Sequence, residues 1–149
     1  MKKFILFAFL LFCSQIAARA DHLWTSTFHS FTTNGIATND NYVYAVTAEA
    51  GFFRSTDNGA HWTQSNTGLP IMYLSCVATL GDYVFIGSAD LGILRSSDKG
   101  LTWRQANNGI GADEILCFLV SGDNIYVGTA TNGLYVSTDQ GDSWSNSST

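Results

Sequence analysis

Hydrophobic and polar residues alternate along this chain with a period of two, in short runs that clusters of Gly, Asn and Asp interrupt. This alternation is typical of short β-strands joined by tight turns. In the middle of the chain it predicts four strands, at 74–79, 83–88, 92–96 and 103–106. No stretch beyond residue 20 has an apolar stripe of useful length with helical period, so we expect an all-β fold.

The same pattern is written three times, 41 residues apart: RSTDNGAHW at 54–62, RSSDKGLTW at 95–103 and VSTDQGDSW at 136–144. Self-similarity at this period indicates a repeat architecture, and a four-stranded unit of about forty residues has the size of one β-propeller blade. We therefore expect a β-propeller-like array of about three four-stranded antiparallel blades, a partial propeller. The blades are predicted at about 30–68, 69–109 and 110–149.

The first twenty residues have the features of a signal peptide. Lys2 and Lys3 precede an apolar run from Phe4 to Phe12, and the small-x-small pattern at 18–20 predicts cleavage before Asp21. The run is too short for a permanent membrane anchor. We expect export to the periplasm or the medium, no membrane insertion after cleavage, and an extra strand near Leu23–Phe28.

Charge argues against nucleic acid as a partner. The whole chain carries a formal charge of −5, and loss of the first twenty residues removes three of its seven basic residues. Four basic residues then face twelve acidic ones, a net charge of −8. So acidic a surface cannot neutralise a run of phosphates.

The repeated phrase resembles the Asp-box, or BNR repeat, of sialidases and other secreted propeller proteins. The resemblance covers nearly the whole chain beyond residue 20, and every defining position matches. Those positions are Ser55, Asp57, Gly59, Trp62, Ser96, Asp98, Gly100, Trp103, Ser137, Asp139, Gly141 and Trp144. In the family these boxes lie at the periphery, away from the catalytic centre, which implies a structural role for all twelve residues.

Local chemistry supports that structural role. Glycine accepts left-handed backbone angles, and an Asp carboxylate or a Ser hydroxyl can bond to backbone groups in its own turn. Tryptophan brings a large apolar body with one N–H donor. We therefore interpret the three Asp residues as parts of turns and not as catalysts.

Sialidase activity is not expected, because the family's Arg-Ile-Pro motif is absent and only three arginines lie beyond residue 20. A second enzymatic hypothesis is glycoside hydrolysis by paired carboxylates about 5–9.5 Å apart. In a propeller the loops from strand two to three and from strand four to the next blade share the face opposite the Asp-boxes. The candidate carboxylates on that face are Glu49, Asp90, Asp113 and Glu114, with Tyr73, Asn108 and Asn132 as candidate ligand-binding residues. A solvated acidic rim is the simpler interpretation.

No cofactor motif and no metal-ligand spacing is present, so neither a cofactor nor a metal is expected. Cys76 and Cys117 occupy matching points of neighbouring repeats. We expect two small buried residues there and no disulfide, since equivalent positions in stacked repeats are usually too far apart for one.

Closed propellers have about 4–8 blades, so three blades leave open faces. The chain is thus expected to be a fragment of a longer propeller, a short open array, or a unit that self-associates, two copies supplying six blades. Our leading hypothesis is an exported non-enzymatic module that binds or scaffolds protein or glycan ligands. The alternative is a glycoside hydrolase, or the remnant of one.

Overall fold

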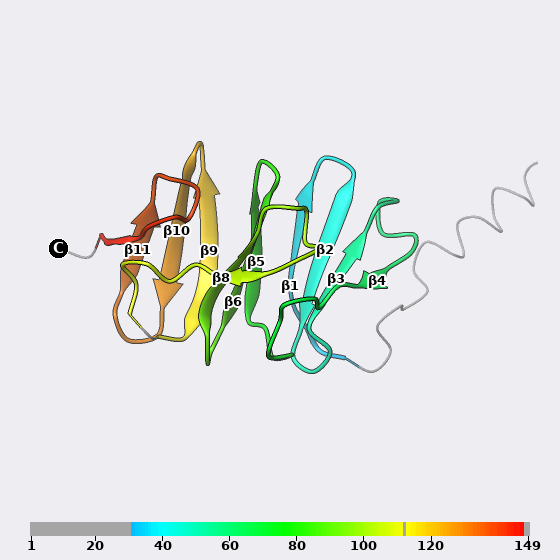
Figure 1. The fold of residues 1–149 in the computed structure, drawn as a ribbon, viewed down its shortest axis with the longest axis horizontal. Coiled ribbons are helices and arrows are strands. Elements are labelled where there is room, and N and C mark those ends of the chain that lie inside the picture. Colours follow the sequence, from blue (N-terminus) through cyan, green and yellow to red (C-terminus); the bar gives the residue numbers. More distant parts are fainter. Residues whose placement is uncertain (1–30, 112, 148–149) are drawn as a thin grey trace, which may run out of the picture.

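The computed structural model describes residues 31–111 and 113–147, which form three four-stranded antiparallel sheets. The first sheet contains β1 (Thr33–Asn39), β2 (Tyr42–Thr47), β3 (Phe52–Ser55) and β4 (Thr63–Gln64). The second contains β5 (Cys76–Leu80), β6 (Tyr83–Ser88), β7 (Gly92–Ser96) and β8 (Arg104–Gln105). The third contains β9 (Ile115–Ser121), β10 (Asn124–Thr129), β11 (Leu134–Ser137) and β12 (Ser145–Asn146). The sheets stand side by side in chain order (Figure 1), which confirms an all-β partial propeller.

Two of the four predicted strands of the second sheet are confirmed, as β6 and β7. The other two were predicted with wrong ends. β5 starts at Cys76 and not at residue 74, because the amide of Leu74 bonds to the carbonyl of Thr47 in the first sheet at 3.1 Å. β8 comprises only Arg104 and Gln105, because the buried Trp103 leaves the ladder to pack between the sheets.

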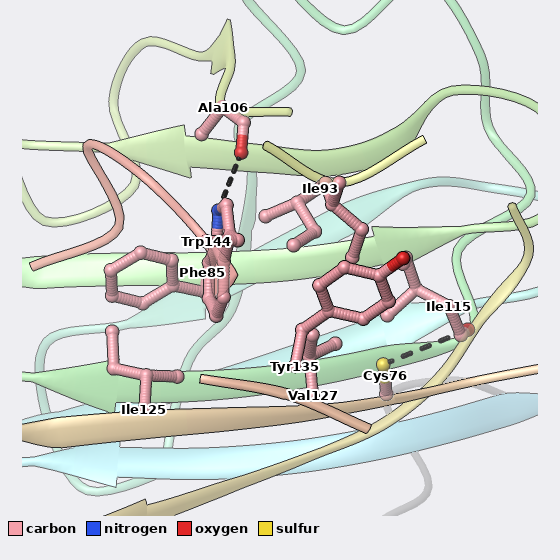
Figure 2. Packing of buried hydrophobic residues seen from close by; sticks show 10 residues of the cluster. Cys76, Phe85, Ile93, Ala106, Ile115, Ile125, Val127, Tyr135 and Trp144 are labelled. Atoms are coloured by element: carbon pink, nitrogen blue, oxygen red, sulfur yellow. Dashed lines mark hydrogen bonds between the residues drawn. The ribbon is translucent and has the colours of Figure 1, made fainter. Parts of the chain in front are cut away.

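Two apolar cores hold the sheets face to face. The core between the first and second sheets consists of Tyr44, Val46, Phe52, Leu69, Leu74, Val84, Ile86, Leu94 and Trp103. The core between the second and third sheets, drawn in Figure 2, consists of Cys76, Phe85, Ile93, Ala106, Ile110, Ile115, Ile125, Val127, Tyr135 and Trp144. Alternate residues of β6 face opposite cores, as the pleat of a strand requires.

The middle sheet is the most buried of the three, since both its faces are covered. Every residue of β7 is buried, and so are all residues of β6 except Tyr83. On the innermost strands of the end sheets large apolar side chains are exposed: Ile36 of β1 to 71% and Leu119 of β9 to 63%. The described part of the chain therefore ends in two faces that carry exposed apolar residues.

Both cysteines of the described residues are free, as expected. Cys76 is buried, and desolvation raises the pKa of its thiol to about 11. The expectation of burial is wrong for Cys117, which is exposed. Cys117 pairs with Gly128 in the third sheet, and no fourth sheet lies against it within the described residues.

The predicted signal peptide at 1–20 and the predicted strand at Leu23–Phe28 lie outside the described residues. Among residues 31–111 and 113–147 no helix is both long and apolar enough to cross a membrane.

Candidate functional site

The candidate carboxylates are distributed over all three blades. Glu49 follows β2, is exposed and accepts a hydrogen bond from the Thr32 amide at 3.1 Å. Asp90 holds the equivalent place after β6, where its amide donates to Ser88 Oγ at 3.1 Å.

Two of the predicted site residues, Asp113 and Asn132, do come together. Asp113 Oδ2 accepts hydrogen bonds from the amides of Asn132 at 2.8 Å and Thr131 at 3.2 Å, and its Oδ1 accepts one from Glu114 at 2.9 Å. Partial desolvation opposes its charge, but bonds from the Thr129 hydroxyl and these loop amides outweigh that effect and lower its pKa to about 2. Asp113 therefore fastens the loop between β10 and β11 and stays ionised at neutral pH.

The remaining predicted ligand-binding residues, Tyr73 and Asn108, have other surroundings. Tyr73 is 52% exposed in the segment between β4 and β5. The side-chain amide of Asn108 donates to the carbonyl of Asp142 at 3.2 Å, so it contacts one of the repeated phrases. Among the seven candidates, the hydrogen bonds within the described residues thus join Asp113 only with Asn132 and with its sequence neighbour Glu114.

The repeated turns, residues 54–62, 95–103 and 136–144, share one hydrogen-bond pattern. In the second turn Ser96 Oγ donates to Asp98 Oδ1 at 2.7 Å and accepts from the Gly100 amide at 2.8 Å. Asp98 Oδ1 also accepts from the Thr102 amide at 2.9 Å, and its Oδ2 from the Thr102 hydroxyl at 2.6 Å. The first and third turns repeat these bonds, with His61 and Ser143 in the place of Thr102.

In each repeated turn these bonds hold the motif aspartate, Asp57, Asp98 or Asp139, in its ionised form. The backbone and side chain of His61, together with Ser55, lower the pKa of Asp57 to about 2. Bonds from Ser143 do the same for Asp139. Desolvation opposes the charge of Asp98, but bonds from Thr102 and Ser96 outweigh it and lower its pKa to about 2 as well. None of the three suits a general acid, which needs a raised pKa.

The repeated turns also join neighbouring blades, which the sequence analysis did not predict. The ring N–H of Trp103 donates to the carbonyl of Ser65 at 3.1 Å, and that of Trp144 to the carbonyl of Ala106 at 2.8 Å (Figure 2). Arg95 reaches from β7 to the third turn, where it bonds to the Gln140 carbonyl and to Asp142 Oδ1 at 2.6 Å. The available signal was the recurrence of tryptophan in all three repeats and of arginine in the first two, at Arg54 and Arg95.

A hollow that the sequence did not predict lies between the second and third blades. Its volume is about 420 Å³, and it is lined by Leu80, Gly81, Asp82, Tyr83, Ser97, Asp123 and Gln140. These residues belong to the β5–β6 and β9–β10 turns and to the repeated turns, at the end of the sheets opposite the loops that contain Glu49, Asp90 and Asn132. Lys99 Nζ lies 3.3 Å from Asp82 Oδ1 beside it. No group of three or more potential metal ligands occurs among the described residues.

No protein-family model and no curated protein matches the chain. Its fold resembles the GH74 xyloglucanase from Xanthomonas campestris, with 21% identity and a TM-score of 0.61 over 84% of this chain and 24% of that one. The GH74 enzyme of Niastella koreensis has 23% identity and a TM-score of 0.58, over 76% of this chain and 22% of that one. YCF48 from Cyanidioschyzon merolae has 19% identity and a TM-score of 0.56, over 76% of this chain and 36% of that one.

At these identities the likeness shows the fold alone, and the chain spans about a quarter of the length of the Xanthomonas enzyme. Its described residues are therefore a partial β-propeller, similar in fold to segments of larger proteins.

Proposed function

We propose that this chain is an exported, non-enzymatic Asp-box protein whose propeller blades bind or scaffold a glycan or protein ligand. The observation that carries the proposal is the 420 Å³ hollow between two blades. Ligand sites are typically concave, with aromatic surface and a few polar groups that fix orientation. Tyr83 supplies an aromatic ring here, while Asp82, Asp123 and Gln140 supply groups that can bond to sugar hydroxyls or peptide amides.

The Asp-box identity rests on the repeated turns. All twelve motif positions match, and in each turn the Ser hydroxyl and the Asp carboxylate bond to the same backbone positions. Such local bonds account for the motif without a role in chemistry.

The alternative function is glycoside hydrolysis, or descent from a hydrolase, through Glu49, Asp90, Asp113 or Glu114. The fold likeness to two GH74 enzymes favours it. Against it, a general acid needs a carboxyl group that keeps its proton near neutral pH, and the pKa of Asp113 is lowered to about 2. Binding without turnover is therefore the function we favour.

A binding screen tests the proposal. The purified chain is applied to panels of glycans, xyloglucan oligosaccharides included, and of peptides, and hits are measured by calorimetry with Asp123→Ala and Asp90→Ala. Both variants remove one carboxylate. Asp123 lines the hollow, whereas Asp90 lies at the opposite end of the sheets and serves as the control. We expect Asp123→Ala to weaken binding about tenfold and Asp90→Ala to leave it unchanged. The reverse result, or no binding to either panel, would contradict the proposal.

The same screen distinguishes glycoside hydrolysis from binding without turnover. Hydrolysis of a glycan that is lost in Asp90→Ala or Glu114→Gln would support the hydrolase. Export is tested by amino-terminal sequencing of protein from the periplasm or medium, where we expect Asp21 as the first residue.

Self-association belongs to the proposal as well. Two copies could close a ring of six blades if the first sheet of each copy covered the third sheet of the other. The outer faces of the end sheets decide whether such a contact fits.

A further inference from the structure

The two internal interfaces show what a covered blade face looks like. The forward face of a sheet is the side that meets the next sheet in sequence. In the first two sheets, a polar side chain near the first residue of β1 or β5 bonds from this face to the next sheet. Asn34 Nδ2 donates to the Leu74 carbonyl at 2.8 Å, and Ser75 Oγ donates to the Ile115 carbonyl at 2.5 Å. The equivalent residue of the third sheet, 41 positions after Ser75, is Leu116, which is 50% exposed.

A second fastening on the forward face comes from arginine. Arg54 donates to the Lys99 carbonyl at 3.3 Å, and Arg95 donates to the Gln140 carbonyl, in each case within the repeated turn of the next sheet. At the same repeat position the third sheet has Val136. Valine has no donor, so the forward face of the third sheet cannot hold a following repeated turn in this way.

Side-chain size differs too. Ala37 and Ala78 occupy one position of the innermost strand in the first two sheets, and Ala78 is buried. The third sheet has Leu119 there, which is 63% exposed. Leu119 pairs with Tyr126, and Tyr126 pairs with Val136, so all three lie on the forward face. At the spacing of the internal interfaces a leucine would overfill the room that an alanine leaves.

We propose that the forward face of the third sheet is the contact surface of a homodimer, in which it meets the same face of a second copy across a twofold axis. The face consists of Leu116, Cys117, Leu119, Tyr126 and Val136. Its fastening groups are missing and its small residue is enlarged, which disfavours the first blade of another copy as the occupant. A twofold contact needs neither the polar fastening groups nor the small residue of the internal interfaces, because the surface has only to complement itself.

Charge favours the same partner. None of the five residues is an Asp, Glu, Lys, Arg or His, in a chain whose formal net charge is −5. Two acidic copies repel each other over most of their surfaces, and an uncharged apolar face is where they can meet without juxtaposing like charges. An exposed apolar patch of this kind is typical of interaction sites.

Matched charge substitutions on the two end faces test the proposal. Leu119→Asp changes the forward face of the third sheet, and Ile36→Asp changes β1 of the first sheet at a side chain that is also exposed. Oligomeric state is measured by light scattering and sedimentation on the full chain or its exported form, with circular dichroism as the check on folding. We expect the wild-type chain to be a dimer. Leu119→Asp or Leu116→Asp should raise the dissociation constant of the dimer at least ~30-fold, and Ile36→Asp should leave it unchanged.

Cys117 provides a second readout, because a twofold contact places the two copies of its face against each other. A flexible bis-maleimide should link wild-type dimers through Cys117 and should fail in Cys117→Ser. Cys13 is replaced by serine wherever residues 1–20 are retained. A wild-type monomer would overturn the proposal. Dissociation by both Leu119→Asp and Ile36→Asp, without cross-linking, would indicate the head-to-tail ring and overturn it as well. None of these results bears on ligand binding in the hollow.

Discussion

Arg95 of the second sheet crosses the blade interface to Asp142 of the third, with Nη2 and Oδ1 2.6 Å apart. The arginine side chain is 4% exposed and the aspartate side chain 66% exposed, so the ion pair lies at the rim while the stem of Arg95 is buried. Its guanidinium also lies 5.0 Å from the ring centroid of Tyr83. Arg95 thus combines apolar packing of its stem with three polar or aromatic contacts.

Replacement of Arg95 by alanine should destabilise the fold by about 2–3 kcal/mol, because it removes buried packing and leaves the Gln140 carbonyl without its donor. Urea unfolding followed by tryptophan fluorescence measures the change. Arg104→Ala is the matched control, since Arg104 approaches the same Asp142 at 3.6 Å but its side chain is 62% exposed. We expect a loss below about 0.5 kcal/mol for the control. Equal losses for both variants would show that the buried stem is unimportant.

Gly141→Ala should destabilise the chain far more than Gly122→Ala. Both glycines have positive φ, 80° and 59°, so each substitution carries a backbone penalty of about 1–2 kcal/mol. A Cβ on Gly141 would also collide with the ring of Phe85 in the second sheet, whereas a Cβ on Gly122 would meet nothing within 4 Å. The urea midpoints of the two variants give the comparison, and similar midpoints would contradict the close packing of the third turn on Phe85.

Stability should fall in acid below about pH 4. Asp57, Asp98, Asp113 and Asp139 have folded pKa values lowered to about 2, so between pH 2 and 4 the unfolded chain binds more protons than the folded chain. Their contribution is complete above their unfolded pKa and is lost as the pH falls toward about 2. The free energy of unfolding measured from pH 2.5 to 6 should therefore rise with pH over the lower part of that range. Asp98→Asn should flatten the rise, and an unchanged slope would count against the bonds of Asp98.

The sheets and their turns could be predicted because their causes are local. The strands β6 and β7 followed from alternation, and the repeated turns followed from Gly, Asp and Ser within nine residues of sequence. The ends of β5 and β8 could not be predicted, because Leu74 and Trp103 make their bonds to the first sheet.

Features that depend on contact with the next blade could not be predicted from the sequence pattern either. One repeat position holds the buried Cys76 and the exposed Cys117, and only the presence of a covering sheet separates the two. The hollow arises from the spacing of two sheets, so no local run of residues predicts it. Arg95 and Asp142 are 47 positions apart, and packing alone selects that partner.

Each repeated turn is a rigid fastening of its blade. Hydrogen exchange at the amides of Gly100 and Gly141 measures this rigidity, because these amides donate to Ser96 Oγ and Ser137 Oγ, both at 2.8 Å. We predict that both amides exchange as slowly as those of β6, through global unfolding alone, and that Ser96→Ala accelerates exchange at Gly100 more than at Gly141. Exchange at both glycines as fast as in an unstructured chain would show that the turns are not rigid.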